Sequence, residues 1–424
     1  MPPHTYYHAT ATEPVPNAPQ LTEPITADVC VIGGGYAGLT AALHLARKGA
    51  SVALLEETRI GDGASGRNGG QVHNGFRHDS HWFEARLGAD FARQIGALGI
   101  EARAHLDWLI QTYNIDAQYL PGLLHLCHKR SYVAETRAHV EEVLNRDPGA
   151  GLRFVDQEEA RSLVNSTDYY GGYLDTHSGH LHALNLALGI ARGAQQHGAR
   201  LYEQSGVTRI ARAAAGWEVH TRSGLVRASN VVLAGNGYLR NLQPDVEARV
   251  MPINNFVLTT EPLGREGAER LIRDRLAVSD SRFVVYYFRI TPDDRLLFGG
   301  GETYSYQFPK DIAGMVRQHM LRVFPQLKDT RIEHAWGGTL AVTNVRLPYV
   351  REIAPGLFNA SGFSGQGIVI APFAGKALAD AIGGDRRVFE LLRQFPIRRF
   401  PGGKLLRWPM LVGAMSWYAL RDHL

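Results

Sequence analysis

A glycine-rich turn between a strand and a helix constrains the fold of this chain more than any other feature. Residues 28–32 (DVCVI) form a short β-branched apolar run, and the turn 33–38 (GGGYAG) follows it directly. Apolar residues then recur at helical spacing over 39–46, and residues 51–55 predict a second strand that ends at Glu56. This order predicts a parallel βαβ unit with a GxGxxG turn.

The glycines and the acidic residue of this unit each have a physical task. Gly33 makes the tight turn, Gly35 lets the backbone approach a pyrophosphate, and Gly38 lets the helix pack on the strand. The helix N-terminus offers amide groups to phosphates, and Glu56 accepts hydrogen bonds from a ribose. The unit predicts a dinucleotide site and leaves FAD and NAD both open; its candidate residues are Gly33, Gly35, Tyr36, Ala37, Gly38, Glu56 and Glu57.

A second glycine cluster follows at residues 59–72 (RIGDGASGRNGGQV). So many glycines exclude regular helix or strand, and the interspersed polar residues are typical of a loop that wraps a polar ring. Arg67 can meet phosphate or flavin oxygens, and the backbone at Gly69 and Gly70 can lie flat against an isoalloxazine. The candidates here are Ser65, Arg67, Asn68, Gly69, Gly70, Gln71 and Val72.

Two further predicted strands end in small residues. Residues 229–237 (SNVVLAGNG) end near Gly235, and residues 356–367 (GLFNASGFSGQG) lead into an apolar helix over 368–382. The positive N-terminal end of that helix suits a flavin C2 carbonyl, where negative charge accumulates on reduction. The second segment adds the candidates Gly362, Gly365, Gln366, Gly367 and Ile368.

Composition limits the remaining classes. The 424 residues suffice for two or three structural units, and the 45% hydrophobic fraction indicates a soluble globular protein. A net charge of +4 is too small to indicate nucleic-acid binding. The two cysteines exclude a disulfide scaffold and favour a reducing compartment, so we expect a cytoplasmic protein. No window spans a membrane, but the Trp/Leu-rich residues 405–420 predict a terminal helix or a weak membrane or subunit contact.

The motifs GGGYAG, SGRNGGQ, LAGNGY, AWGG and GFSGQG occur in this order along the chain. In this arrangement the chain resembles the D-amino-acid-oxidase-type family of FAD-dependent amine oxidoreductases. The resemblance implies a mixed α/β fold: a Rossmann-like FAD-binding domain and a discontinuous substrate domain built on an antiparallel sheet. It places residues 1–80, 147–247 and 334–424 in the FAD-binding domain, and 81–146 and 248–333 in the substrate domain. It also places Val207 beside the adenine.

The resemblance also implies how the cofactor is held and used. Some relatives attach FAD covalently through Cys or His, but neither Cys30 nor Cys127 lies in a flavin segment, and Arg67 stands roughly where one such group carries its His. We therefore expect non-covalent FAD. Flavin chemistry implies hydride transfer from the carbon next to nitrogen, with O2 or another electron acceptor reoxidising the flavin.

Substrate residues are predicted from strand alternation and proximity to the motifs. Tyr287 and Arg289 share one face of a predicted strand, where Arg289 either pairs with a γ-glutamyl carboxylate or is an exposed strand arginine. His73 follows the flavin loop and can orient the amine, and Trp336 can wall the pocket; both can equally be structural. The closely spaced acidic and histidine residues match no metal-binding spacing, so we expect no metal: Asp175, His177, His180 and His182.

The expected activity is oxidation of the C–N bond of an amine. The substrate that the resemblance implies is γ-glutamylputrescine or a related γ-glutamylated polyamine, with an imine hydrolysing to aldehyde and ammonia. A D-amino acid or N-methyl amino acid oxidase or dehydrogenase is the alternative enzyme. A flavin-bearing subunit of a larger complex is the alternative of another class.

Overall fold

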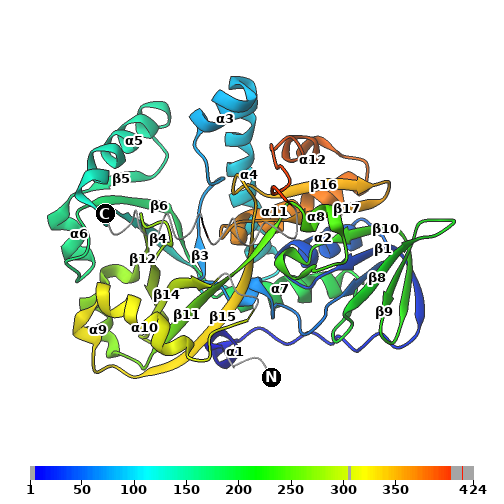
Figure 1. Cartoon of the computed structure of the whole chain (residues 1–424), viewed down its shortest axis with the longest axis horizontal. Helices are drawn as coiled ribbons and strands as arrows, with labels where there is room; N and C mark the ends of the chain where they lie inside the picture. Colours follow the sequence, from blue (N-terminus) through cyan, green and yellow to red (C-terminus); the bar gives the residue numbers. More distant parts are fainter. Residues whose placement is uncertain (1–4, 304–306, 403–412, 414–424) are drawn as a thin grey trace.

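The computed structural model describes residues 5–303, 307–402 and Gly413, and their strands form two sheets (Figure 1). The first sheet is the predicted dinucleotide-binding type, because β1 runs parallel to β10 on one side and to β2 on the other. Its strands, in spatial order, are β16 (Tyr349–Ala354), β17 (Leu357–Ser361), β10 (Leu225–Leu233), β1 (Pro24–Ile32), β2 (Val52–Leu55) and β7 (Arg200–Tyr202), while β8 (Val207–Arg212) and β9 (Trp217–Thr221) extend from β10.

Helices cover this first sheet because its central strands are apolar on both faces. All four residues of β2 and the last four of β1 are buried. The covering helices are α2 (Tyr36–Arg47), α7 (Ala183–Gln196) and α11 (Gly367–Ile382). The predicted strand at 28–32, the helix over 39–46, the strand at 51–55 and the helix over 368–382 are all confirmed.

The second sheet is mainly antiparallel, as predicted, with one parallel pair between β4 and β12. Its order is β15 (Ile332–Val342), β11 (Met251–Thr260), β14 (Leu296–Thr303), β13 (Tyr287–Ile290), β12 (Ala277–Asp280), β4 (Leu120–Leu126), β6 (Gly172–His180) and β3 (Gln71–Val72), with β5 (Leu152–Val155) on β6. The predicted pairing of strands around the turn at 292–294 is confirmed by the antiparallel β13–β14 register.

The remaining helices lie around the two sheets. In Figure 1, α9 and α10 flank the second sheet at the lower left, and α5 and α6 lie above them. The predicted helix over 311–324 is confirmed as α10. These helices are α1 (Tyr6–Thr10), α3 (Ser80–Leu87), α4 (Ala89–Thr112), α5 (Val133–Arg146), α6 (Gln157–Leu163), α8 (Pro244–Glu247), α9 (Gly264–Leu271), α10 (Ile312–Val323) and α12 (Arg387–Leu392).

Sheet membership divides the chain differently from the expected domain boundaries. β5 and β6 pair with the second sheet although they lie within residues 147–247, and β15 does so although most of it lies within 334–424. Both ranges were assigned to the FAD-binding domain. The difference arises because strand partners lie far apart in sequence: β6 pairs with β3, about a hundred residues away, and no local pattern encodes that choice.

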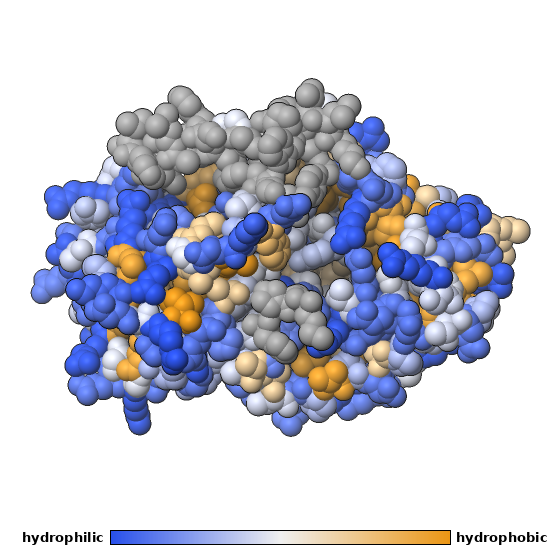
Figure 2. Space-filling view, turned by 60° about the horizontal axis from the view of Figure 1, so that its bottom comes forward, coloured by the Kyte–Doolittle hydropathy of each residue, from blue (hydrophilic) through white to orange (hydrophobic). Residues whose placement is uncertain are grey.

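The expected membrane or subunit contact can be compared with the outer surface and with the described part of the C-terminal segment. The face in Figure 2 is mainly hydrophilic, with small separate apolar patches. No helix within the described ranges is long and apolar enough to cross a membrane. The Trp/Leu-rich residues 405–420 lie, apart from Gly413, outside the described residues.

Two buried histidines join α2 to α4 and predict acid sensitivity. The Nε2 atoms of His44 and His105 lie 2.9 Å apart, and burial lowers the pKa of each to about 3. In the unfolded chain both titrate near 6.5, so below that pH the unfolded state binds more protons and the folded state loses stability. This loss continues until the pH reaches the folded pKa.

We expect replacement of His105 by glutamine to weaken this pH dependence. Between pH 7 and pH 5 the variant should lose about 2 kcal/mol less stability than the wild-type chain, because one depressed ionisation is gone. Urea unfolding at both pH values measures the difference. The exposed His177 provides the control, since its replacement by glutamine should leave the slope unchanged. An unchanged slope in the His105→Gln variant would contradict the prediction.

Candidate active site

One cavity of about 1610 Å³ connects the glycine-rich turns of the first sheet with the inner face of the second. It exceeds the roughly 300–1,000 Å³ of a pocket for one drug-sized ligand. Among the predicted residues, those that line it are Gly33, Gly35, Tyr36, Ala37, Glu56, Glu57, Ser65, Arg67, Asn68, Gly69, Gln71, His73, Val207, Gly235, Tyr287, Gly365, Gln366, Gly367 and Ile368. Six separate parts of the chain therefore meet at one cavity: residues 33–37, 56–73, 207, 235, 287 and 365–368.

The turn after β1 has the conformation that a dinucleotide-binding loop requires. Gly33 has a φ of 110°, which side-chain-bearing residues rarely adopt. A Cβ at Gly38 would lie 2.0 Å from the Gly33 carbonyl oxygen, so this glycine lets α2 begin against the turn. Gly38 does not line the cavity itself; it acts through packing. The N-terminus of α2 consequently faces the cavity at Gly35, Tyr36 and Ala37.

Glu56 directly follows β2 and lines the cavity. Its Oε2 accepts a 2.7 Å hydrogen bond from the Gly34 amide, and its Oε1 accepts one of 2.9 Å from the Thr58 amide. Burial raises the pKa of Glu56, while the hydrogen bonds from Thr58 and Gly34 act in the opposite direction. Oε1 also accepts from the Thr58 hydroxyl at 3.1 Å, whereas Oε2 has a single hydrogen bond and retains acceptor capacity for a ribose hydroxyl.

Replacement of Glu56 by glutamine is expected to weaken FAD binding about 10-fold or more, because a hydrogen bond to a charged acceptor contributes about 1.5–3 kcal/mol. Titration of the apoprotein with FAD, followed by quenching of flavin fluorescence, gives the dissociation constant. Glu266→Ala on the exposed surface of α9 serves as the control and should bind FAD normally. Equal affinities for wild type and Glu56→Gln would show that another group holds the ribose.

The loop from Gly61 to Gly70 is fixed largely by its own side chains. Asn68 donates to the carbonyls of Ala64 and Ser65 and accepts from the Gly70 amide at 2.8 Å. The Arg67 guanidinium is buried, donates to the Asp62 carbonyl at 2.6 Å and still lines the cavity. The loop thus presents a defined polar surface to the cavity, as a flavin-binding segment requires.

The turn after β17, at the same carboxyl edge of the first sheet, supplies the helix N-terminus predicted from sequence. α11 begins at Gly367, after Gln366 and Gly365, and the φ of 89° at Gly365 favours glycine. Gly365 to Ile368 line the cavity, whereas Gly362 does not. The amide of Gly362 donates to the Asn236 side chain at 2.9 Å, and a Cβ at Gly362 would lie 2.5 Å from the Thr343 side chain. Gly362 therefore links its own turn to the turn that contains Asn236.

Tyr287 stands where the two sheets meet at the cavity. A Cβ at Gly69 would lie 2.4 Å from its ring, and one at Gly299 would lie 2.0 Å from it, so the ring fits between two glycines. Its hydroxyl donates to the Asn255 side chain. Burial is the largest cause of its raised pKa, and the phenol therefore stays protonated at neutral pH.

His73 also lines the cavity, in a cluster of uncharged rings. Its ring centroid lies 5.6 Å from that of His125, which in turn stacks on Tyr173 at 4.6 Å. Burial, and then the charge of Arg77, lower the pKa of His73 to about 4. Both histidines are neutral at physiological pH, because burial also holds the pKa of His125 well below its usual value.

Two predicted pocket residues lie behind the cavity instead of in it. Arg289 is 2% exposed, and it donates to the Gly69 carbonyl at 3.0 Å and to the Leu181 carbonyl at 3.2 Å. Trp336 is fully buried and donates through Nε1 to the Arg67 carbonyl at 2.9 Å. We predicted that both side chains contact the substrate, but neither lines the cavity. Each instead donates a hydrogen bond to a backbone carbonyl of the 61–70 loop on the side away from the cavity.

Two loop residues on the predicted cofactor surface are likewise turned away from the cavity. Val72 is fully buried in β3, and Gly70 packs against Leu181, whose carbonyl oxygen would lie 2.3 Å from a Cβ at Gly70. The positive φ of Gly70, 77°, turns the chain from the loop into β3. These two residues shape the loop without lining the cavity.

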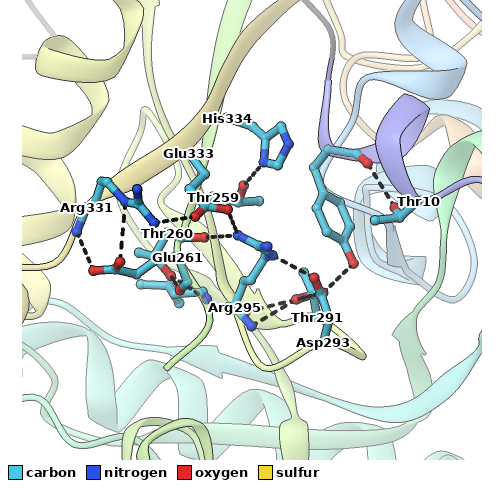
Figure 3. A network of polar contacts seen from close by, with 12 residues as sticks. Thr10, Thr259, Thr260, Glu261, Thr291, Asp293, Arg295, Arg331, Glu333 and His334 are labelled. Carbon is cyan, nitrogen blue, oxygen red and sulfur yellow. Dashed lines mark hydrogen bonds and ion pairs between the residues drawn. The ribbon is translucent and has the colours of Figure 1, made fainter. Parts of the chain in front are cut away.

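The N-terminal helix α1 holds this arrangement together from outside. The Tyr7 hydroxyl accepts from Arg289 at 3.2 Å, and His8 contacts the Asp62 carboxylate at 2.7 Å. Tyr6 donates to Asp293 at 2.7 Å and so joins the polar network in Figure 3. In that network Arg295 lies between Asp293 and Glu333, at the β13–β14 turn and the edge of β15 (Figure 3).

Sequence reasoning missed several charged and polar residues of the second-sheet part of the cavity. Arg77, Asn255, Glu302 and Arg346 all line it. Glu302 directly follows the glycine run 299–301, and its pairing with Asn255 joins two strands far apart in sequence. Arg77 and Arg346 lie outside the strands and in none of the motifs. Among the described residues, no group of three or more potential metal ligands comes together.

A dinucleotide-binding turn, a second flavin-type loop and a helix N-terminus around one cavity define a flavin-dependent oxidoreductase. The chain belongs to the DAO family of FAD-dependent oxidoreductases, whose family model matches residues 28–381. It is 38% identical over 421 residues to "Gamma-glutamylputrescine oxidoreductase" of Escherichia coli (strain K12), covering 99% of this chain and 98% of that protein. It is 40% identical over 422 residues to "Probable oxidoreductase OrdL" of Rhizobium meliloti (strain 1021), covering 100% and 98%.

Solved structures agree on the fold. Glycine oxidase from Geobacillus kaustophilus matches with a TM-score of 0.71 at 22% identity, covering 84% of this chain and 95% of that one. At this identity the match concerns architecture alone. The chain is thus an FAD-dependent oxidoreductase with a mixed α/β fold.

Proposed function

We propose that this enzyme oxidises the primary amine of γ-glutamylputrescine or a related γ-glutamylated polyamine. The observation that carries the proposal is the single cavity, which continues from the dinucleotide loops into a compartment with apolar walls and charged groups on the second sheet. The 38% identity to a γ-glutamylputrescine oxidoreductase over nearly the full length of both chains supports this choice of substrate.

When bound, FAD supplies a two-electron acceptor for the hydride of the carbon next to nitrogen. The product imine then takes up water and releases an aldehyde and ammonia, and O2 accepts the two electrons and two protons to become hydrogen peroxide. The residues fitted to hold the cofactor are those of the turn 33–37, Glu56, the loop 65–71 and residues 365–368. We also propose that the enzyme works in the cytoplasm.

The contribution of the chain to the reaction is to orient the amine. Phe283, Val285 and the partly exposed Phe308 supply apolar surface to the second-sheet part of the cavity. The neutral imidazole of His73 and the protonated phenol of Tyr287 offer hydrogen bonds without adding charge. With a pKa of about 4, His73 does not retain a proton from the substrate ammonium at neutral pH.

The test is reduction of the flavin in the absence of oxygen, followed in a stopped-flow spectrometer. We expect γ-glutamylputrescine to bleach the flavin of the holoenzyme, and peroxide to form in equal amount with aldehyde once O2 is admitted. D-alanine and sarcosine are the comparison substrates. Bleaching by these amino acids alone would replace the proposal with an amino acid oxidase, and aldehyde without peroxide would show an acceptor other than O2.

We expect FAD to be released by acid precipitation, leaving a colourless protein pellet. Both thiols are buried away from the cavity, with Cys30 inside β1 and Cys127 after β4. The absorbance of pellet and supernatant at the flavin bands measures the distribution. A yellow pellet after washing in denaturant would contradict non-covalent binding and would direct attention to His73 or His125 on the cavity wall.

A further inference from the structure

Two arginines from distant parts of the chain meet at the second-sheet end of the cavity. Arg77 follows β3, Arg346 lies between β15 and β16, and both line the cavity. The segments are joined one residue away from each arginine, because the His78 ring donates from Nε2 to the Val345 carbonyl at 2.7 Å. The His78 ring is itself stacked on Trp82, with centroids 4.1 Å apart. The joint holds the two segments that carry the arginines side by side, and Arg346 is near enough to act on the charge of Arg77.

The Arg346 side chain is positioned by an aromatic neighbour. Its guanidinium carbon lies 4.7 Å from the centroid of the Phe283 ring, and Phe283 also lines the cavity. Its amide donates to the Thr343 carbonyl at 3.1 Å and closes the turn that carries it. A guanidinium stacked on a ring keeps its edge free for a planar anion.

The charges at this end favour an anionic group. Neither Arg77 nor Arg346 forms an ion pair with a carboxylate of the described residues, whereas nearby Arg282 is paired with both Asp168 and Asp280. Although Arg77 is exposed at the edge of the cavity, partial desolvation and the charge of Arg346 lower its pKa to about 10, and Glu302 opposes this shift. Two cations that share one wall are therefore stabilised by a bound anion.

We propose that Arg77 and Arg346 bind the free carboxylate at the γ-glutamyl end of the substrate and select for amines that carry it. This inference rests on the proposed function and names the group recognised at the same site. Two guanidinium groups provide parallel donors for one carboxylate. Glu302 also lines the cavity, and its charge acts on Arg77. The apolar Phe283, Val285 and Phe308 suit the methylene chain between the two polar ends.

The test compares two amines that differ only at the far end. γ-Glutamylputrescine carries the carboxylate and the α-ammonium, whereas N-butanoylputrescine has the same amide and reacting amine without these two groups; the arginine variants report on the carboxylate. For Arg77→Gln and for Arg346→Gln, we expect kcat/KM with γ-glutamylputrescine to fall about 10- to 100-fold, through KM, since charge-assisted hydrogen bonds are lost. With N-butanoylputrescine the variants should stay within about two-fold of wild type, and Arg346→Lys should retain part of the binding.

A binding measurement separates this inference from the proposed function. N-butyl-γ-glutamine presents the same carboxylate and α-ammonium and lacks the terminal amine that the proposed reaction oxidises, so calorimetry with the holoenzyme kept free of O2 measures recognition without that reaction. Its dissociation constant should rise about 10- to 100-fold in the two glutamine variants and stay unchanged in Arg265→Gln, an exposed arginine of α9. Equal losses with both amines, or unchanged binding of N-butyl-γ-glutamine, would overturn the arginine site. Failure of every amine to reduce the flavin would instead overturn the proposed function.

Discussion

Replacement of Gly38 by valine is expected to abolish formation of the folded, FAD-loaded enzyme. A Cβ at this position would lie 2.0 Å from the Gly33 carbonyl oxygen and 3.2 Å from the Ala234 Cβ. The Ala234 amide is hydrogen-bonded to the Ile32 carbonyl at 2.8 Å, so these atoms belong to the ends of the central strands. They cannot move without shifting the sheet itself.

The expected loss exceeds that of ordinary overpacking. Extra methyl groups in a packed core usually cost about 1–3 kcal/mol. Here the obstacle is backbone, and we expect a loss above about 4 kcal/mol, a large part of the roughly 5–15 kcal/mol that stabilises a native protein. Circular dichroism, thermal unfolding and the visible flavin spectrum of the purified variant measure it.

A matched glycine elsewhere provides the control. Gly96 lies in α4, is exposed, and a Cβ there would meet nothing within 4 Å. Gly96→Ala should therefore raise stability by about 0.5–1 kcal/mol, because alanine is the better helix former. A Gly38→Val variant with normal flavin content and unfolding temperature would refute the close approach of α2 to the turn.

The βαβ unit was predictable because its signals are local. A β-branched run, a turn that needs glycine and a helical apolar period lie within residues 28–56, and each is set by neighbours in sequence. The same holds for the hairpin around Asp293 and for α10. In these segments local preference and final structure agree.

The side chains of the pocket were predictable only in part. Strand alternation correctly places Tyr287 and Arg289 on one face of β13, but it does not decide which of them reaches the cavity. Arg289 is held away from the cavity by two distant partners. It donates to the Gly69 carbonyl, 220 residues away in sequence, and to the Tyr7 hydroxyl. Arg77 and Arg346 escaped prediction for the same reason, since their meeting depends on the contact between His78 and Val345.

Replacement of Arg289 by leucine is expected to destabilise the enzyme by about 3–5 kcal/mol and to lower its FAD content. The buried guanidinium serves the Gly69 and Leu181 carbonyls and the Tyr7 hydroxyl. Leucine fills part of the space but leaves these buried acceptors without donors, at about 1–3 kcal/mol each. The loop at Gly69 then loses its fixed position on the cavity wall.

Two further variants test whether the loss of stability comes from the hydrogen bonds of Arg289. Tyr7→Phe removes one acceptor and should cost about 1 kcal/mol, while Arg289→Lys keeps the charge but not the forked geometry and should fall between the two. Urea unfolding and the ratio of flavin to protein absorbance give both quantities for each variant. Wild-type stability and flavin content in Arg289→Leu would show that the loop is held by other contacts.

Kinetics with the two amines distinguish bracing from substrate binding at Arg289. Because the guanidinium faces the back of the 61–70 loop, Arg289→Lys should change kcat/KM for γ-glutamylputrescine and for N-butanoylputrescine by the same factor. An arginine that bound the γ-glutamyl carboxylate would instead affect only the substrate that carries it, as expected for Arg346. A selective loss with γ-glutamylputrescine in Arg289→Lys, with flavin content unchanged, would return Arg289 to the substrate site.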